Sequence, residues 1–501
     1  MQKSEFDVVI VGAGISGVGM ACHLKKHSPG QSFTILERRQ RAGGTWDLFR
    51  YPGIRSDSDM LTLGYSFRPW KGLKVLADGD AIRNYVEETA HENALHDDIQ
   101  FGQKIVESKW SSEDARWTVV SQDENSGEKR TFTCKFLVMG TGYYNYDKGY
   151  EPEFPGIENF EGQVIHPQKW PENLDYAGKR VIVIGSGATA VTLVPAMANN
   201  GAQVTMLQRS PSYVLSLPGL DGVLRLLDRF MPEKLALGVT REKNIQRQNF
   251  FYKFFQRFPK LSKMLLLRET KRQLRGKVDM KHFTPSYNPW DQRLCLVPDG
   301  DLFKTLRDGK ANIVTDHIDS FTAKGIKLKS GQTLEADIII TATGLDLQAL
   351  GGMSLEVDGK PIKFEEKMFY KATMIEDIPN FSWIFGYTNA SWTLKANIAA
   401  KYLCRVINHM SSTGKDIAVP RDLEGCKVPE MPFLGSLTSG YVVRANDRLP
   451  RQGSKEPWKV LNDFKRDQKV LLKDPVDDGV LQFLKAGQSS ASKVTPLRRA
   501  A

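Results

Sequence analysis

The sequence predicts an α/β protein with two domains of parallel sheet and a helical insertion in the second domain. A strand, a glycine-rich turn, a helix and a second strand follow one another in residues 7–37, and the same order returns in residues 181–209. A basic, helix-like stretch then separates the second copy from its closing strands. Because strand, helix and parallel strand in this order form the βαβ unit of Rossmann-like domains, we expect two such domains.

Size and composition agree with a globular protein of several domains. The 501 residues exceed what one hydrophobic core usually holds, and 41% hydrophobic and 25% charged residues are typical of globular proteins. No apolar run approaches the ~18 residues of a membrane span. The first residues run directly into a strand pattern without a signal peptide, and five scattered cysteines include no CxxC pair. We therefore expect a cytoplasmic protein without a disulfide framework or a metal site.

The first repeated unit begins with the β-branched strand 8–11 and continues into a helix over 18–26. Between them, Gly12 permits a tight turn, Gly14 lets the backbone approach a pyrophosphate, and Gly17 lets helix and strand pack closely. A helix that starts at such a turn offers free N–H groups and the positive end of its dipole to phosphate. The pattern therefore predicts a dinucleotide site.

The second unit repeats this plan. Residues 181–184 are a strand, residues 185–190 are the turn Gly-Ser-Gly-Ala-Thr-Ala, and residues 191–198 are helical. A further strand at 204–207 completes it. One glycine turn alone is weak evidence for a ligand, but two copies in the same strand–turn–helix context predict two dinucleotide sites.

Opposite charges follow the second strand of each unit. Glu37 lies 25 residues after Gly12, where a carboxylate can accept both hydroxyls of a ribose, as FAD or NAD requires. Arg209 occupies the matching place in the second unit, where a guanidinium favours a ribose 2′-phosphate. The first site is therefore expected to bind FAD and the second NADPH.

The net charge of +11 is concentrated in the predicted helical insertion. Residues 240–282 hold 13 Lys or Arg against three acidic residues, together with many Phe and Leu. One interpretation is a basic amphipathic helix that packs on the body of the protein; the other is peripheral contact with an anionic membrane surface. No nucleic-acid-binding motif accompanies the charge, so nucleic acid is not an expected partner.

A sequence motif between the two units carries a family resemblance. Residues 160–171, Phe-Glu-Gly-Gln-Val-Ile-His-Pro-Gln-Lys-Trp-Pro, match the pattern FxGxxxHxxxWP at every fixed position, with His166 and Trp170 in it. This resembles the fingerprint of type I Baeyer–Villiger monooxygenases, whereas the related flavin-containing monooxygenases usually have Phe or Tyr in place of Trp170. A lone histidine such as His166 is more often a hydrogen-bonded structural residue than a catalyst.

Other segments extend the resemblance along almost the whole chain. Residues 43–46 and 50–53, together with Asp57, are similar to the family's flavin-contacting segment, although Asp-Leu-Phe at 47–49 departs from it. Pro-Gln follows His166 where a threonine is common. These two departures, together with the sequences of residues 288–293 and 386–393, make the chain resemble one subgroup of the family. That subgroup includes the mycobacterial ethionamide-activating monooxygenase.

The resemblance implies a reaction. NADPH reduces FAD, O₂ forms a C4a-peroxyflavin, and a ketone becomes an ester or lactone; sulfides and thioamides can also be oxygenated. Arg293 matches the family's active-site arginine and Asp57 its carboxylate partner, so these two residues are the expected catalytic pair. The alternative is a flavin-containing monooxygenase restricted to nitrogen and sulfur atoms. A flavin disulfide reductase would need a redox cysteine pair, and a flavin-free membrane scaffold would be a non-enzymatic alternative.

The two turns and the resemblance together give the expected cofactor contacts. Those to FAD are Gly12, Gly14, Ser16, Gly17, Glu37, Gly44, Thr45, Trp46, Asp47, Arg55, Ser56, Asp57 and Ile105. Those to NADP are Gly185, Ser186, Gly187, Ala188, Thr189, Ala190, Arg209 and Ser210. The remaining partners are the small ketone or sulfide and O₂, and the oligomeric state stays open.

The resemblance also implies that the chain returns to its first domain. The expected division is a FAD-binding domain in two parts, residues 1–147 and 346–487, and an NADP-binding domain in two parts, residues 148–216 and 291–345. The basic helical insert occupies residues 217–290. A Ser-rich, disordered tail is expected at residues 488–501.

Overall fold

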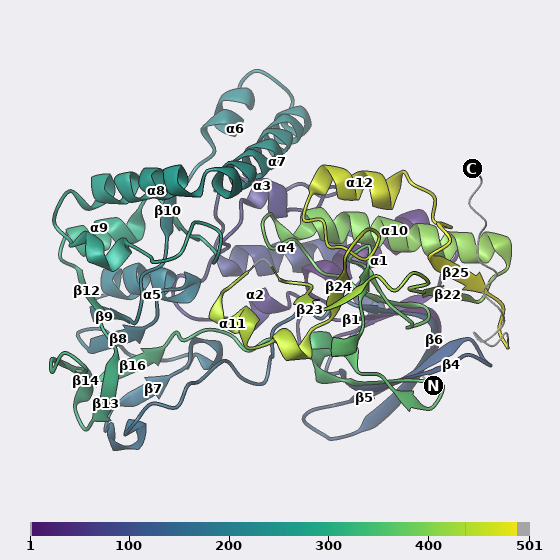
Figure 1. Cartoon of the computed structure of the whole chain (residues 1–501), viewed down its shortest axis with the longest axis horizontal. Coiled ribbons are helices and arrows are strands. Elements are labelled where there is room, and N and C mark those ends of the chain that lie inside the picture. The colour runs from purple at the N-terminus through teal and green to yellow at the C-terminus, as the bar shows by residue number, and fades with distance from the viewer. Residues whose placement is uncertain (1–2, 436, 488–501) are drawn as a thin grey trace.

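The structure is a computed structural model that describes residues 3–435 and 437–487. The tail expected at 488–501 lies outside the described residues. Figure 1 shows a large sheet at one end of the molecule, a smaller sheet at the other end, and helices α6, α7 and α8 along one edge. The α/β fold class predicted from the sequence is confirmed, and the chain carries Rossmann-like parallel sheet in both halves.

The large sheet has eleven strands, most of them in the order β18-β17-β4-β5-β6-β1-β2-β3. Its parallel part joins β3, β2, β1 and β6, and its antiparallel part runs through β4 and β5. The strands are β1 (Glu5–Val11), β2 (Phe33–Leu36), β3 (Ile99–Gln100), β4 (Lys104–Ser111), β5 (Arg116–Gln122), β6 (Lys129–Met139), β17 (Ser354–Val357), β18 (Lys360–Pro361), β19 (Phe369–Tyr370), β20 (Met374–Ile375) and β21 (Phe381–Trp383).

The chain returns to this sheet after it has built the second one. Strand β17 pairs with β4, and β21 pairs in parallel with β6. Helices α1 (Ile15–His27), α4 (Gly79–Glu92) and α10 (Trp392–Thr413) pack together on one face of it. The first βαβ unit is therefore enclosed by residues that come some 380 positions later.

The smaller sheet has five parallel strands in the order β12-β9-β8-β16-β7. They are β7 (Gln163–Ile165), β8 (Arg180–Ile184), β9 (Gln203–Gln208), β12 (Ala311–Thr315) and β16 (Ile338–Thr341). Helices α5 (Ala188–Asn199) and α9 (Asp301–Arg307) pack on one face. The other face packs on a separate three-stranded antiparallel sheet of β13 (Ile318–Thr322), β14 (Gly325–Leu328) and β15 (Thr333–Glu335).

The helical insertion lies between two short strands that pair in parallel, β10 (Val214–Leu217) and β11 (Cys295–Pro298). It consists of α6 (Gly222–Leu227), α7 (Glu233–Arg257) and α8 (Pro259–Leu274). Pro259 fits the first position of α8, where no intrahelical N–H bond is lost. Among the described residues no helix is both long and apolar enough to cross a membrane.

The C-terminal residues add short elements over the first domain. Strand β22 (Ile417–Pro420) pairs with β25 (Leu481–Leu484), and β23 (Lys427–Pro432) pairs with β24 (Arg451–Gly453). Helices α11 (Gly440–Val443) and α12 (Phe464–Leu472) complete this part. Near the N-terminus, α2 (Thr45–Leu48) and α3 (Met60–Leu63) are single helical turns.

Both helices of the repeated units start three residues earlier than the sequence predicted. Helix α1 begins at Ile15 rather than residue 18, and α5 begins at Ala188 rather than residue 191. The reason is that Gly14 and Gly187 are themselves the extended N-cap residues, so the last part of each turn is already helical. Gly17 therefore lies inside a helix, at a cost of about 1 kcal/mol in helix propensity.

Candidate active site

In the first glycine turn the backbone at Gly12 passes so close to that at Gly17 and Gly140 that side chains have no room. A Cβ on Gly17 would lie 1.8 Å from the carbonyl oxygen of Gly12, and a Cβ on Gly12 would lie 2.9 Å from that of Gly140. Gly12 also has a φ of +97°, in the region that favours glycine. The N-cap of α1 has no side-chain hydrogen bond, so its first N–H groups are available to a ligand.

Glu37 is held at the end of β2 by backbone donors. Its Oε2 accepts from the N–H of Ala13 at 2.6 Å, and its Oε1 accepts from that of Arg39 at 2.8 Å. Burial raises the pKa of Glu37 above its ordinary value despite these two bonds. Each carboxylate oxygen keeps a further acceptor position, so the side chain that lines the pocket can still bind a ribose hydroxyl.

The second glycine turn has the same crossing but a more open outer side. A Cβ on Gly185 would lie 2.3 Å from the carbonyl oxygen of Ala342, whereas a Cβ on Gly187 would meet nothing within 4 Å. The hydroxyl of Ser186 donates to the carbonyl oxygen of Ser210 at 3.0 Å. Arg209 follows β9 with its side chain exposed, beside the open end of the turn.

One pocket joins the two turns. Gly12, Gly14 and Glu37 line it on the first side, and Ala188 and Thr189 at the start of α5 line it on the second. Further walls come from residues that the sequence predicted: Ser16, Gly44, Thr45, Trp46, Arg55, Asp57, Ile105 and Arg293. A dinucleotide bound along the first turn would thus reach the N-terminus of α5.

Arg293 and Asp57 form an ion pair in this pocket. Nη1 of Arg293 lies 3.1 Å from Oδ2 of Asp57, and 30% of the arginine side chain is exposed, toward the pocket it lines. Burial opposes its charge, yet the pKa of Arg293 is raised above its ordinary value because Tyr441, Tyr143 and Asp57 surround the guanidinium. The pocket therefore holds a permanent positive charge whose Nε has no partner among the described residues.

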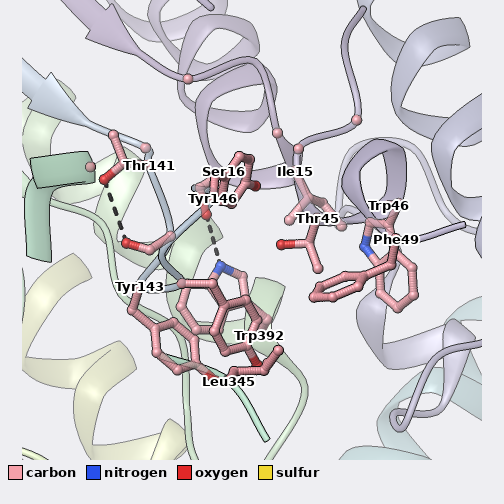
Figure 2. A pocket seen from close by; sticks show the side chains of 18 of the residues that line it. Ile15, Ser16, Thr45, Trp46, Phe49, Thr141, Tyr143, Tyr146, Leu345 and Trp392 are labelled. Atoms are coloured by element: carbon pink, nitrogen blue, oxygen red, sulfur yellow. Dashed lines mark hydrogen bonds between the residues drawn. The ribbon is translucent and has the colours of Figure 1, made fainter. Parts of the chain in front are cut away.

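Aromatic rings form much of the pocket wall. Tyr143 stacks on Trp392 with ring centroids 5.4 Å apart, and the indole N–H of Trp392 donates to the hydroxyl of Ser16 at 2.8 Å. Figure 2 shows these two rings opposite Thr45, Trp46 and Phe49. Large apolar surfaces of this kind exclude water from the space between them.

Besides Gly17, two predicted FAD contacts lie outside the pocket wall. Asp47 is buried in ion pairs with Arg39, at 2.6 Å, and with Arg50. The hydroxyl of Ser56 instead donates to the carbonyl oxygen of Ser58 and accepts from the N–H of Ala77. Their side-chain polar atoms hold the neighbouring loops, and direct contact of either residue with FAD stays a prediction.

Most predicted NADP contacts lie beside the pocket rather than on its wall. Ala188 and Thr189 line it, while Gly185, Ser186, Gly187, Ala190, Arg209 and Ser210 lie along the adjoining turn and strand end. Ala190 stands where the first turn has Gly17, and its side chain is fully buried. Gly17 likewise serves packing and does not line the pocket.

His166 connects the two segments that link the sheets. Its Nδ1 accepts from the N–H of Gln168 at 3.2 Å, so its Nε2 can donate to the carbonyl oxygen of Gly344 at 3.3 Å. The amide of Gln168 donates to the carbonyl oxygen of Asn145 on the other linking segment. Burial lowers the pKa of His166, which keeps the ring neutral near pH 7. Trp170 packs on the core of the second domain.

The comparisons with known proteins agree with this geometry. Residues 74–348 match the flavin-binding monooxygenase-like family, and residues 10–72 match an NAD(P)-binding Rossmann-like domain. The chain belongs to the flavin-binding monooxygenase-like family. The predicted enzyme class, a flavoprotein monooxygenase, is confirmed.

Relatives of this monooxygenase match it over nearly its whole length. Putative FAD-containing monooxygenase MymA of Mycobacterium tuberculosis is 55% identical over 495 residues, 98% of this chain and 100% of that protein. FAD-containing monooxygenase EthA of the same organism is 51% identical over 486 residues, 97% and 99% of the two chains. Probable FAD-binding monooxygenase AlmA of Acinetobacter baylyi is 50% identical over 496 residues, 99% of each.

Solved structures with the same fold are more distant in sequence. Oxidised steroid monooxygenase bound to NADP superposes with a TM-score of 0.76 at 22% identity, covering 96% of this chain and 100% of that one. The complex of OTEMO with FAD and NADP gives 0.69 at 21% identity, covering 84% and 87%. The names of the relatives mention FAD, and the structures with the same fold contain FAD and NADP, in agreement with the two cofactors predicted for this monooxygenase.

Several pocket residues of this monooxygenase were not predicted. Tyr143, Tyr144 and Tyr146 follow β6, and Tyr387 follows β21. The position of the first three is a usable signal, since side chains that follow a parallel strand gather at the ligand edge of the sheet. Tyr387 lies in the segment 386–393, which carried part of the family resemblance. No comparable signal marks Leu350 or Gly351, because they reach the pocket only when the chain returns to the first sheet.

Proposed function

We propose that this monooxygenase is of the Baeyer–Villiger type. It would convert a ketone, O₂, NADPH and a proton into an ester or lactone, NADP⁺ and water, and would also oxygenate sulfides and thioamides. The observation that carries the proposal is the Arg293–Asp57 ion pair in the pocket that both glycine turns border. The fingerprint at residues 160–171, with Trp170, supports a ketone rather than a nitrogen or sulfur atom alone.

The residues present fit both cofactors. The side-chain-free crossing at Gly12 and the free N-terminus of α1 fit the pyrophosphate of FAD, with Glu37 at its ribose. The open side of Gly187 and the exposed Arg209 fit the phosphates of NADP. Residues 1–147 with 346–487 would thus bind FAD, and residues 148–216 with 291–345 would bind NADP. Bound FAD, once reduced by NADPH, supplies an oxygen atom activated from O₂.

Arg293 would stabilise the negative oxygen that forms as the ketone carbonyl is attacked. Its guanidinium is fixed by the ion pair with Asp57. Arginine suits this role because it cannot deprotonate, whereas a buried lysine could. A preorganised charge in a site without water typically contributes about 10²–10³ in rate.

The aromatic wall would keep the pocket dry during the reaction. Tyr143, Trp392 and Trp46 border the space next to the ion pair. Because the charge of Arg293 acts more strongly where water is excluded, the wall and the ion pair work together.

The test follows labelled oxygen into product. Purified enzyme with FAD, NADPH and ¹⁸O₂ is given phenylacetone or 2-octanone, and products are identified by mass spectrometry. We expect an ester that carries one ¹⁸O atom for each NADPH oxidised in coupled turnover. Oxygenation of a sulfide or an amine with no ester from either ketone would instead assign the enzyme to the heteroatom-oxygenating relatives.

Arg293→Ala separates the catalytic role from folding. We expect ester formation to fall by about 10²–10³ while anaerobic reduction of FAD by NADPH persists. Arg421→Ala is the matched control, since Arg421 pairs with Asp377 at 2.7 Å outside the pocket. Unimpaired ester formation by the Arg293 variant would remove this residue from the mechanism.

A further inference from the structure

The helical insertion carries an exposed apolar surface where α7 passes into α8. Phe250 is 63% exposed and Phe258 49% exposed, and both rings contact Phe254. On α8 the exposed apolar residues are Leu261, Met264 and Leu265. We call these five exposed residues, Phe250, Phe258, Leu261, Met264 and Leu265, the corner face. Apolar side chains grouped in this way on a surface mark an interaction site.

Helix α8 is built to present this surface outward. Its buried residues, Ser262, Leu266, Thr270 and Leu274, recur every four positions and face the body of the protein. The corner-face residues recur at the i, i+3 and i+4 spacing of the opposite side, and Arg268 and Lys271 continue the same stripe. Figure 1 shows α8 along the outer edge of the molecule, away from the large sheet.

Positive charge surrounds the corner face. Lys260, Arg268, Lys271, Arg275 and Lys277 are exposed, and none forms a salt bridge with a described residue. Other bases of the insertion are already paired, for example Lys243 with Asp221 and Arg247 with Asp59. One group of cations therefore forms ion pairs within the protein, and a second, exposed group can bind an external anion.

We propose that the corner face docks on an anionic lipid bilayer. Apolar side chains would enter the boundary between headgroups and acyl chains, and the surrounding cations would contact lipid phosphates. The charge favours this occupant over a second copy of the chain, because a symmetric dimer through this face would oppose two sets of the same cations.

The insertion that would dock on the bilayer also contacts the pocket. On the buried side of α7, Ile245 packs with Tyr387 and Leu394, and Tyr387 also lines the pocket of Arg293. A ketone dissolved in lipid would then meet an insertion that also contacts a residue of the pocket. This consequence rests on the proposed function, whereas the docking does not.

The docking is tested by sedimentation with vesicles of phosphatidylcholine alone or with about one-third phosphatidylglycerol. The flavin-loaded enzyme should bind the anionic vesicles at least about tenfold more tightly, and less tightly at high salt. Replacing Lys260, Arg268 and Lys271 by Glu should lower binding by about 10²-fold or more, at roughly fivefold per cation lost. Leu261→Ser with Met264→Ser and Leu265→Ser should also weaken it.

A matched control changes the same charge elsewhere. Lys129, Lys324 and Lys360 are exposed at the start of β6, between β13 and β14, and in β18, and replacing them by Glu should leave vesicle binding within about threefold. Flavin content and NADPH-dependent O₂ consumption without substrate should be unchanged in all variants. The proposal would be overturned if the control variant lost binding equally, or if the wild type did not sediment with vesicles. It would also be overturned if the wild type bound no vesicles but formed dimers in ultracentrifugation that only the corner-face variants abolish.

Discussion

The two glycine turns share a backbone plan and differ in how closely the chain surrounds them. In the first, Gly14 lies against Gly44, Gly17 allows no Cβ, and Glu37 is buried. In the second, a Cβ on Gly187 would meet no atom of the described residues within 4 Å, and Arg209 is exposed. An enclosed site suits a cofactor that stays bound, and an open site suits one that exchanges at each turnover. We therefore expect the two dinucleotides to differ in their rate of exchange as well as in the charge at the ribose position.

The largest expected difference between the two turns appears when a glycine in each is replaced by alanine. Gly17→Ala places a Cβ 1.8 Å from the carbonyl oxygen of Gly12, and this backbone atom cannot move without shifting β1 or α1. We expect a loss of more than ~3 kcal/mol in the free energy of unfolding and a protein with little FAD. Gly187→Ala meets open space and should keep stability and flavin content. Equal effects of the two substitutions on melting temperature and flavin absorbance would contradict the difference in enclosure between the two turns.

The next largest effect is expected at low pH, which should destabilise the first βαβ unit more than the second. His23 on α1 is 2% exposed, and burial lowers its pKa to about 4 although it contacts Asn397 on α10. The pKa of His23 in the folded protein lies below the ordinary 6.5 of the unfolded chain, so the unfolded state takes up a proton first as the pH falls. The stability that neutral His23 contributes is therefore complete above pH 6.5 and is lost as the pH falls toward 4. The loss amounts to about 3 kcal/mol at pH 4. Helix α5 has no ionisable residue in the corresponding place.

The measurement is the free energy of unfolding from pH 7 to pH 4 in wild type and in His23→Gln. The variant keeps a hydrogen-bonding group but has no proton to gain, so its stability should fall less over this range. A pH dependence as steep as that of the wild type would show that other groups, and not His23, govern the acid sensitivity of the first unit.

A smaller change should separate the two ribose sites. Arg209→Ala removes the guanidinium proposed for the 2′-phosphate, and losing a charge-assisted hydrogen bond costs about 1.5–3 kcal/mol. We expect the KM for NADPH to rise roughly 10–100-fold, with little change for NADH. Arg209→Lys, which keeps the charge but loses the bidentate geometry, should lie between the two. An equal rise for both nucleotides would place the 2′-phosphate elsewhere.

The sequence predicted those parts of the site that are made by neighbouring residues. The strand at 33–36 has the predicted bounds, the strand predicted at 181–184 begins one residue earlier at Arg180, and both turns are where the glycines indicated. The pairing of Arg293 with Asp57 followed from a resemblance between motifs, since nothing local relates two residues 236 positions apart. Asp47 is expected near the flavin, and the ion pairs of its carboxylate with Arg39 and Arg50 could not be predicted from the sequence.

The sequence by itself therefore determined the two βαβ units, the sign of charge at each ribose position and the basic insertion. These depend on strand and helix periods and on backbone crossings that only glycine permits, which are properties of a few adjacent residues. The tertiary structure decided which side chains meet in the pocket, including Tyr143, Tyr387 and Trp392, and which face of α8 stays outside. Such contacts depend on packing between segments hundreds of residues apart, where burial and competing partners fix the orientation of each side chain.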